Sequence, residues 1–330
     1  MKIAFVTESS YSGKYPRNFG NSRTEIAWQI ALDAENFHFN DIYSVEGYDH
    51  VFVIIPKGRV FLSAEGIRTG NGINPVNSLL KFNVAQFLKK SNKKVHFMQE
   101  GPNWWPSDYT VEEQINWYNT LVSFDSIFCH NEHDKKYYQG LLPTFKVNVM
   151  RSLMIEDTIS NVVANKQNKV IIGGNFSHFY GGFNSYFISE EFTGCEKYTM
   201  ESHSKREDEH LIEDLKHIPR CLWTEWINVL STFKYAIHLM PTVAAGTFSL
   251  NCAYFGIPCI GNEKVDTQRI LFPKLSVDVE DLIKARDLAK KLHKDIDFYK
   301  ECSQYAKETY QKEYYSDVWK KNMEKTLSEL

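Results

Sequence analysis

The sequence predicts an α/β protein with two doubly wound domains, each a parallel sheet covered by helices. The chain has 330 residues, which is more than a domain with a single hydrophobic core usually contains. Short β-rich runs alternate with amphipathic helical patterns from the first residues on. This alternation stops in the polar residues 156–169 and then begins again. We therefore expect two domains that face a cleft.

The first half of the chain contains the strands and helices of one doubly wound domain. We expect strands at residues 2–7, 51–55, 94–99, 126–130 and 146–150. We expect helices at residues 22–34, 77–91, 111–123 and 133–140. This order is typical of a parallel sheet, because parallel neighbours need a crossover connection. The domain is predicted to cover residues 1–155.

The second half repeats the pattern after a linker at residues 156–168. We expect strands at residues 169–174, 196–201, 235–240, 258–261 and 275–277. We expect helices at residues 183–191, 208–217, 224–232, 249–255 and 279–292, and a helical pattern throughout residues 298–330. The second domain is therefore predicted at residues 169–313, with a final helix at residues 314–330.

The composition limits the class of protein. Hydrophobic residues make up 43% and aromatic residues 14% of the chain, which is enough apolar surface for compact domains. The six cysteines form no CxxC pair, and no run approaches the roughly 20 apolar residues of a membrane span. The first residues are typical of a strand and not of a signal peptide. We expect a soluble cytoplasmic protein, whose net charge of −3 gives no overall sign of a nucleic-acid partner.

Two glycine-containing loops are candidates for binding a phosphorylated ligand. In residues 170–183, VIIGGNFSHFYGGF, an apolar strand runs directly into glycines, which allow close approach of the main chain or a positive φ. In residues 223–261, Thr247 and Ser249 lie where a helix is expected to begin. Their hydroxyls and the free N–H groups of that helix suit a phosphate or a ribose. The alternative is an ordinary capped helix.

The second of these loops carries a family resemblance. The order of helix, apolar strand, glycine-rich loop, helix and FGIPCI resembles the carboxyl domain of the GT-B glycosyltransferases, which use nucleotide sugars. In that family a glutamate in the pattern G…SLEA…GxP bonds the donor ribose, and this chain reads GTFSLNCAYFGIP with Asn251 there. An amide also hydrogen-bonds hydroxyl groups. Many retaining members have a second acidic residue where this chain has Val243, so the resemblance favours inversion.

The first loop narrows the resemblance to one branch of the family. VIIGGNFS is similar to the first strand and loop of the carboxyl domain in the phage DNA β-glucosyltransferases, where GGSF and following arginines grip the diphosphate. This chain lacks those arginines, so we expect Arg206 or Arg269 to supply charge. The resemblance assigns the donor site to Gly173, Gly174, Asn175, Phe176, Ser177, His178, Gly246, Thr247, Phe248, Ser249, Asn251 and Arg269.

A carboxylate at the end of a first-domain strand is the candidate catalytic group. In VHFMQEGP, Glu100 ends an apolar strand before a rigid turn, and the strand resembles the one that carries the acidic base of the phage enzymes. Inverting transfer needs a carboxylate to accept the acceptor's proton. The alternative is a surface glutamate at a strand end. Trp104 and Trp105 follow it, as candidates either for stacking on a sugar or base or for ordinary packing.

Two loops carry a local excess of positive charge. Their basic residues are Lys14, Arg17, Arg23, Lys57, Arg59 and Arg68. In the GT-B family the loop after the first strand commonly meets the acceptor or the leaving diphosphate, so we expect both loops to face an anionic acceptor. The alternative is a pair of solvated loops whose charge has no function.

Motifs for metals and other cofactors are weak. HNEHD at residues 130–134 has metal-ligand residue types, but Asn131 is placed to cap a helix. Asp295 and Asp297 match a DxD motif but lie in the helical tail. Ser12 to Lys14 lacks P-loop spacing, and no strand leads into GxGxxG. We expect no metal site and no tightly bound cofactor, since the GT-B fold requires no divalent metal.

The resemblance implies a glycosyltransferase that moves a sugar from a UDP-sugar to a hydroxyl group by direct displacement, with inversion favoured. The acceptor it implies is a hydroxymethylated pyrimidine in double-stranded phage-type DNA, which would place the protein in the host cytoplasm. The final helix is expected to pack back on the first domain. Two alternatives stay open: an acceptor that is a cell-envelope glycan or small molecule, and a non-catalytic scaffold that binds a nucleotide or DNA. The sugar and the oligomeric state are also left open.

Overall fold

The structure is a computed structural model of the 330-residue chain. It describes all residues except 8, 10, 39, 40, 42–44, 46, 56–60, 64, 65, 70, 71, 75–93, 178 and 202–206, and it gives only the backbone of the strands between residues 61 and 74. Contacts divide the chain into two compact units: residues 1–16 and 28–151 form the first, and residues 17–27 and 152–330 form the second. The linker at residues 156–168 and the packing of the final helix on the first domain stay predictions.

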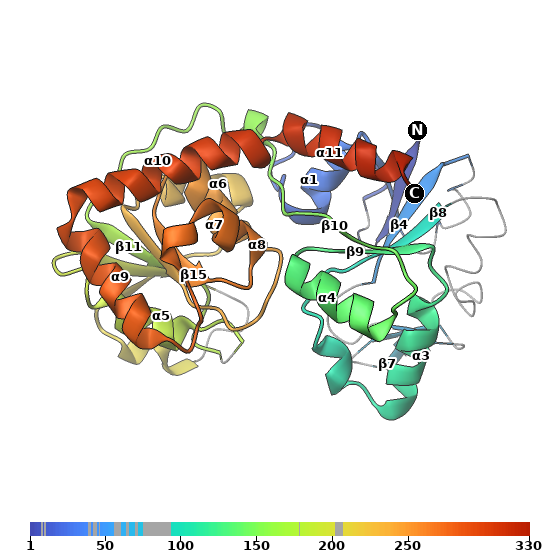
Figure 1. Ribbon diagram of the computed structural model, residues 1–330, viewed down its shortest axis with the longest axis horizontal. Helices are drawn as coiled ribbons and strands as arrows, with labels where there is room; N and C mark the ends of the chain where they lie inside the picture. The colour runs from blue at the N-terminus through green and yellow to red at the C-terminus, as the bar shows by residue number, and fades with distance from the viewer. Residues whose placement is uncertain are drawn as a thin grey trace. The chain divides into compact units, whose positions relative to one another are not determined.

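The first unit contains a mainly parallel sheet with the strand order β10-β9-β8-β4-β1-β3-β2 (Figure 1). The strands are β1 (Ile3–Thr7), β2 (Gly13–Lys14), β3 (Glu35–His38), β4 (His50–Ile54), β8 (Lys94–Met98), β9 (Ser126–Cys129) and β10 (Val147–Val149). The helices of this part of the chain are α1 (Thr24–Ala31), η3 (Trp105–Asp108), α3 (Val111–Leu121) and α4 (Glu132–Leu141). Every residue of β1 and β4 is buried, as expected for parallel strands covered on both faces.

All five strands predicted in the first half are present. The structure adds β3, which pairs in parallel with β1, and an antiparallel sheet of β5 (Phe61–Ser63), β6 (Gly66–Thr69) and β7 (Gly72–Asn74). β3 escaped prediction because its sequence ENFH has a single apolar residue and therefore no strand pattern. The helix expected at residues 77–91 lies outside the described residues.

A chain of buried polar side chains crosses the core of the first unit. His50 Nδ1 lies 2.9 Å from His96 Nε2, and His96 Nδ1 lies 2.8 Å from Ser126 Oγ. Burial lowers the pKa of His96 to about 3, and it also lowers the pKa of His50. A neutral imidazole has one donor and one acceptor nitrogen, so each ring can be a link in this chain. Three strands, β4, β8 and β9, are thereby joined inside the sheet.

The sheet of the second unit is parallel throughout, with the order β13-β12-β11-β14-β15-β16. Its strands are β11 (Lys169–Ile172), β12 (Glu196–Met200), β13 (Leu215–Ile218), β14 (Tyr235–His238), β15 (Cys259–Asn262) and β16 (Ser276–Val277). The chain starts in the middle at β11, moves outward to β13, and then continues from β14 on the other side. The strand order therefore reverses between β11 and β14.

The helix predicted at residues 208–217 is wrong. The segment forms a short 3-10 helix, η5 (Glu207–Leu211), and then enters β13. Leu215 and Ile218 are buried, and all four residues of β13 pair with β12. Pairing with the sheet edge thus overrides the local helical pattern of this polar segment.

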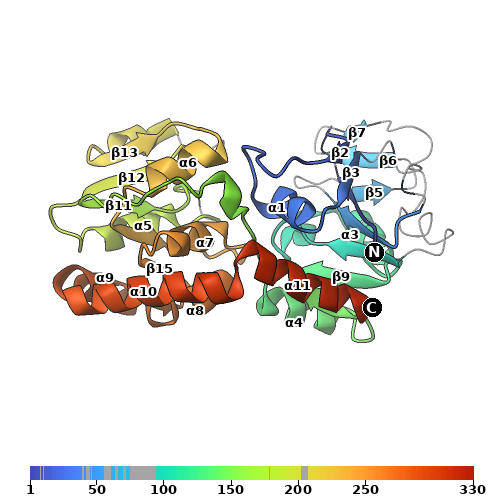
Figure 2. The ribbon, with the colours of Figure 1, turned by 90° about the horizontal axis from the view of Figure 1, so that it is seen from above.

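Helices surround the sheet of the second unit in the pattern of a doubly wound fold (Figure 2). They are η4 (Glu156–Thr158), α5 (Gly182–Ser189), α6 (Trp223–Leu230), α7 (Thr247–Tyr254), α8 (Asp266–Leu271), η6 (Pro273–Leu275), α9 (Leu282–Lys294), α10 (Ile296–Glu313) and α11 (Ser316–Ser328). α10 packs along α7 and α8. No helix in the described part of the chain combines the length and hydropathy needed to cross a membrane.

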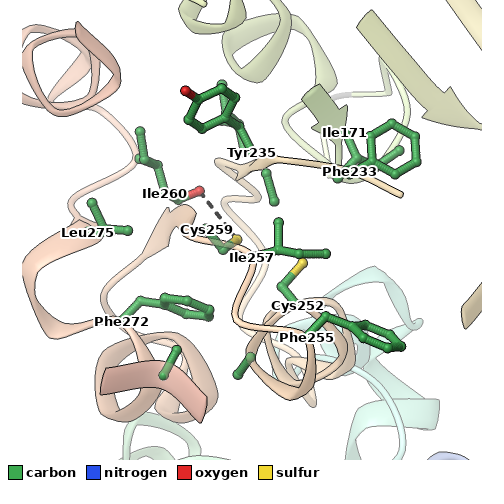
Figure 3. Close-up of a cluster of buried hydrophobic side chains, with 14 of the residues drawn as sticks. Ile171, Phe233, Tyr235, Cys252, Phe255, Ile257, Cys259, Ile260, Phe272 and Leu275 are labelled. Atoms are coloured by element: carbon green, nitrogen blue, oxygen red, sulfur yellow. Dashed lines mark hydrogen bonds between the residues drawn. The ribbon is translucent and has the colours of Figure 1, made fainter. Parts of the chain in front are cut away.

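The core of the second unit contains free thiols among aromatic and aliphatic side chains. Figure 3 shows Cys252 of α7 near Cys259 of β15, whose Sγ donates to the carbonyl of Ile260 at 3.8 Å. Burial raises the pKa of the Cys252 thiol, so it remains protonated and packs as a small apolar group. All six cysteines are free.

A buried carboxylate holds the break between α10 and α11. Glu156 accepts hydrogen bonds from the hydroxyl of Tyr310 at 2.6 Å and from the backbone N–H of Ser316 at 3.1 Å. Burial raises the pKa of Glu156, while these two donors lower it. The helical pattern predicted for residues 298–330 is therefore present, with one interruption that a distant residue stabilises.

Candidate functional site

The candidate site lies where the strand order of the second unit reverses. In doubly wound sheets, the loops at the carboxyl ends of the two strands beside such a point diverge and leave room for a ligand. Here these loops are residues 173–182, after β11, and residues 239–246, after β14. The N–H of Gly173 donates to the carbonyl of Ile237 at 2.7 Å, which keeps the starts of the two loops together.

The glycines of the first loop are required for its close packing. Gly174 and Gly181 have positive φ values of 80° and 67°. A Cβ atom at Gly181 would lie 1.9 Å from the carbonyl oxygen of Leu239, and one at Gly182 would lie 2.3 Å from that of Asn175. The main chain of this loop therefore does make the expected close approach. Within this unit it approaches the backbone that follows β14.

Side chains inside this loop fix its shape. Asn175 is buried, and its Oδ1 accepts from the N–H and the hydroxyl of Ser177 at 3.0 Å and 2.7 Å. The N–H of Phe176 lies 3.4 Å from Oε1 of the buried Glu209, whose Oε2 lies 3.1 Å from His217 Nε2. The polar atoms of Asn175 and Ser177 thus have structural partners, while the predicted ligand residue His178 lies outside the described residues.

The second loop leads into α7 through a position that only glycine fits. Gly246 has a φ of 75°, and a Cβ there would lie 1.9 Å from Oγ1 of Thr267. That hydroxyl donates to the carbonyl of Gly246 at 2.9 Å, which ties the start of α7 to α8. The first N–H groups of a helix have no partner inside the helix. Those of Thr247 and Phe248 are therefore suited to bind an anion.

Two predicted site residues on α7 differ in what their side chains do. The hydroxyl of Ser249 donates to Oε1 of Gln268 at 2.8 Å, so it braces α8. Asn251 is only 3% exposed, and among the described residues its amide has no hydrogen-bond partner. Its amide atoms are not fully shielded from solvent, so a ligand with hydroxyl groups would reach them and complete their hydrogen bonds.

His238 is a candidate site residue that sequence reasoning missed. It ends β14, and its ring centroid lies 4.8 Å from that of Phe248 on α7. A Cβ at Gly173 would lie 2.7 Å from the His238 ring, so the first glycine of the pair makes room for the imidazole. The apolar surroundings lower the pKa of His238 to about 4. The available signal was a titratable residue at the end of the apolar run YAIH.

The charge predicted to meet a diphosphate is partly neutralised. Arg269 Nη2 lies 3.1 Å from Oδ1 of Asp266 in the same helix, α8. Arg206, the other residue predicted for this role, lies outside the described residues. Within the described part of the site, hydrogen-bond donors are therefore the groups that are most clearly available to bind a diphosphate.

Glu100 lies two residues after the end of β8 in the first unit and is half-buried. It lines a small hollow of about 30 Å³ together with aromatic side chains: Phe97, Trp105, Tyr109, Trp117 and Tyr138. The ring of Trp105 covers Gly101, where a Cβ would lie 2.1 Å from it. Trp105 thus packs within its own unit, and the hollow has room for about one water molecule.

The basic residues predicted to face an acceptor are only partly described, and their role stays a prediction. Lys14 Nζ lies 2.6 Å from Oδ2 of Asp33, and Arg17 pairs with Asp157. Contacts group Lys14 with the first unit but Arg17 and Arg23 with the second. Lys57 and Arg59 lie outside the described residues, and only the backbone of Arg68, in β6, is described.

The HNEHD segment has a structural arrangement. Nδ2 of Asn131 lies 3.1 Å from Oδ2 of Asp134, and Nδ2 of Asn103 lies 3.0 Å from Oδ1 of the same carboxylate. This buried aspartate joins the start of α4 to the turn after β8. Within the described parts of the chain, no group of histidine, cysteine and acidic side chains is arranged to hold a metal.

Solved structures share this fold over their whole length, although no family model and no curated protein matches the sequence. An α-glucosyltransferase in complex with UDP and a 13-mer DNA containing an HMU base has a TM-score of 0.63 and 12% identity, over 99% of this chain and 98% of that one. The Anabaena protein HepE in complex with UDP-glucose has a TM-score of 0.65 and 10% identity, over 100% of both chains. The trehalose-6-phosphate synthase OtsA has a TM-score of 0.63 and 9% identity, over 99% and 91%. At this identity the likeness shows the fold alone, and that fold is GT-B, as the sequence predicts.

Proposed function

We propose that the protein is a glycosyltransferase that transfers a sugar from a UDP-sugar to a hydroxyl acceptor. The observation that carries the proposal is Asn251, a buried amide without a hydrogen-bond partner among the described residues, on the helix that follows the strand reversal. A ligand with hydroxyl groups would complete its hydrogen bonds. In GTFSLNCAYFGIP this residue occupies the position of the ribose-binding glutamate of the GT-B family.

In the proposed complex the diphosphate binds at the N-terminus of α7. The free N–H groups there favour an anion, and the glycines of residues 173–182 bring a second stretch of backbone to the same sheet edge. Asn175 and Ser249 contribute through loop shape and backbone, because their side chains already have partners. The neighbours with bound UDP or UDP-glucose support uridine as the nucleotide. Neither a divalent ion nor a bound cofactor is needed for this scheme.

The proposed reaction is a direct displacement. A bond forms between the acceptor oxygen and the anomeric carbon, and the bond from that carbon to the UDP oxygen breaks. Glu100 takes the acceptor's proton, and UDP leaves with the electron pair near the positive end of α7. An α-linked donor then gives a β-linked product. An α-linked product from an α-linked donor would overturn this inverting displacement, and neighbours named α-glucosyltransferase and α,α-trehalose 6-phosphate synthase make that outcome worth testing.

The role of Glu100 is tested by Glu100→Gln. We expect turnover to fall by about 10²–10⁴-fold, while the affinity for UDP stays the same. Glu132→Gln changes a half-exposed carboxylate after the neighbouring strand β9 and is the matched control. Full activity in Glu100→Gln would remove this residue from the mechanism.

For the acceptor we propose a hydroxymethylated pyrimidine in double-stranded DNA. The neighbour bound to DNA with an HMU base supports it. Neighbours named sucrose-phosphate synthase and trehalose-6-phosphate synthase favour a small sugar acceptor instead, at similar TM-scores of 0.61 and 0.63. The six free cysteines fit a reducing cytoplasm, where phage DNA would be modified.

The deciding experiment measures UDP release from a panel of UDP-sugars with hydroxymethylated DNA, ordinary DNA, sugar phosphates or no acceptor. Release that requires hydroxymethylated DNA, with a sugar mass on the modified base, supports the whole proposal. DNA activity should also fall steeply as salt rises, because counterions are released on binding. Release with a sugar phosphate alone would show that the acceptor is a sugar phosphate and not DNA. Failure to bind UDP would overturn the proposal that the donor is a UDP-sugar.

A further inference from the structure

We propose that His238 donates a hydrogen bond to the β-phosphate of the bound nucleotide and so stabilises the leaving group. The inference rests on the proposed function, because it specifies a residue of the same donor site. In the phage enzymes, arginines after the glycine pair grip the diphosphate, and this chain has none there. The inference gives part of that role to a side chain of β14.

The position of His238 is the first argument. It is the last residue of β14, and β14 is one of the two strands beside the reversal of strand order. Ligands in doubly wound folds bind outside the carboxyl ends of these strands. The ring lies 4.8 Å from that of Phe248, which belongs to the first turn of α7. The imidazole therefore contacts a side chain of the first turn of α7, the helix whose N–H groups we propose to hold the diphosphate.

The space around the ring is the second argument. Any side chain at Gly173 would collide with the imidazole, because a Cβ there would lie 2.7 Å from its Cγ and Cδ2. The neighbouring strand contributes Gly261, which pairs with His238 in the β14–β15 register. The chain gives up side-chain packing at Gly173 beside this half-buried histidine, whereas the room left at Gly261 is taken by Gln268. Such clearance is unnecessary for a residue that only fills the core.

The missing partner is the third argument. No described residue forms a hydrogen bond with His238. The buried histidines His50 and His96, whose pKa values are also lowered, are by contrast paired with each other. Three residues lie next to His238: Gly173 after β11, Phe248 on α7 and Gly261 on β15. None of them titrates or carries charge. A neutral imidazole keeps one N–H donor, which an oxygen of a phosphate would accept.

The test compares the affinities of UMP and UDP for the intact protein and for His238→Phe. Phenylalanine keeps a ring against Phe248 and removes both nitrogen atoms. We expect UDP binding to weaken about tenfold, the effect of one hydrogen bond to a charged group, and UMP binding to change less than about twofold. His238→Gln retains an N–H donor and should recover part of the loss for UDP.

The matched control is His293→Phe. His293 lies on α9 against Phe192 and Tyr235, at the opposite end of β14. It should leave the affinities of both nucleotides unchanged. Equal losses for UMP and UDP in His238→Phe, or no loss, would overturn the inference and leave the proposed function standing. If the unchanged protein binds neither nucleotide, the proposed function fails and this inference fails with it.

Discussion

Two groups of polar side chains, one in each unit, differ in how they are paired. In the first unit, His50, His96 and Ser126 hydrogen-bond to one another across three strands. In the second, Asn251 and His238 have no such partner among the described residues. An unpaired buried polar group costs stability, yet the described residues also contain such groups away from the site, for example Gln29 Oε1 and Trp223 Nε1. We therefore expect a ligand residue to be marked by the lack of a partner together with a position beside the strand reversal.

Acid should act strongly on the paired histidines. The pKa of His96 is lowered to about 3 in the folded protein, so its contribution is complete above the unfolded pKa of 6.5 and is lost as pH falls toward 3. The loss should reach roughly 3 kcal/mol by pH 4, at about 1.4 kcal/mol per pH unit below the unfolded pKa. Urea unfolding between pH 7.5 and pH 4 measures it. His96→Phe should flatten this dependence, and an equal acid slope in both proteins would contradict the assignment.

The glycine loop offers a test of packing at the ligand site. Gly181→Ala places a Cβ 1.9 Å from the carbonyl of Leu239 at a φ of 67° and should cost about 3 kcal/mol or more. Gly194→Ala is the matched control, because its φ is 76° but nothing lies within 4 Å of the new atom. It should cost about 1 kcal/mol. Urea unfolding of both variants decides the point, and equal losses would show that backbone conformation alone matters.

Asn251→Leu and Ser126→Ala address the comparison directly. Ser126→Ala leaves a buried imidazole nitrogen unpaired and should cost about 1–3 kcal/mol without affecting UDP. Asn251→Leu removes an amide that has no protein partner, so stability should change by less than about 1 kcal/mol, while UDP binds about tenfold more weakly. Thermal unfolding and UDP titration of each variant provide the readouts. A large loss of stability in Asn251→Leu with normal UDP binding would reverse the interpretation.

The smallest effect is expected at an exposed ion pair. Lys14 and Asp33 are 2.6 Å apart, but their side chains are 48% and 73% exposed. Lys14→Ala should therefore change stability by less than about 1 kcal/mol. If Lys14 contacts DNA phosphate, the slope of log affinity against log salt should fall by about 1. An unchanged slope would remove it from the acceptor surface.

Strongly patterned elements could be predicted from the sequence. β1, β4, β8 and β9 are buried apolar runs between polar segments, and their pattern allows little else. β13 could not be predicted, since LKHI becomes a strand only by pairing with β12. β3 has the same problem, because its pairing with β1 is absent from its local sequence.

The parts of the site that depend on glycine could be predicted from the sequence. The roles of polar side chains could not, because they depend on hydrogen-bond partners that the sequence does not show. The glycines of these loops indicate either a positive φ, as at Gly174, Gly181 and Gly246, or a close approach, as at Gly173, and the sequence predicts these two possibilities together. Ser249 and Asn251 look equivalent in sequence, yet one braces Gln268 and the other has no partner among the described residues. His238 was overlooked because the clearance around it depends on Gly173, which is distant in sequence.

The hydrogen bonds of Glu156 bear on the order in which the protein can fold during synthesis. Its partners Tyr310 and Ser316 follow 154 and 160 residues later. The first unit is complete once residue 151 has left the ribosome, whereas the second also includes residues 17–27 and the last helices. Residues 17–27 must therefore wait for most of translation before their own unit can close. Pulse-labelled chains should show protease resistance in the first unit well before the second.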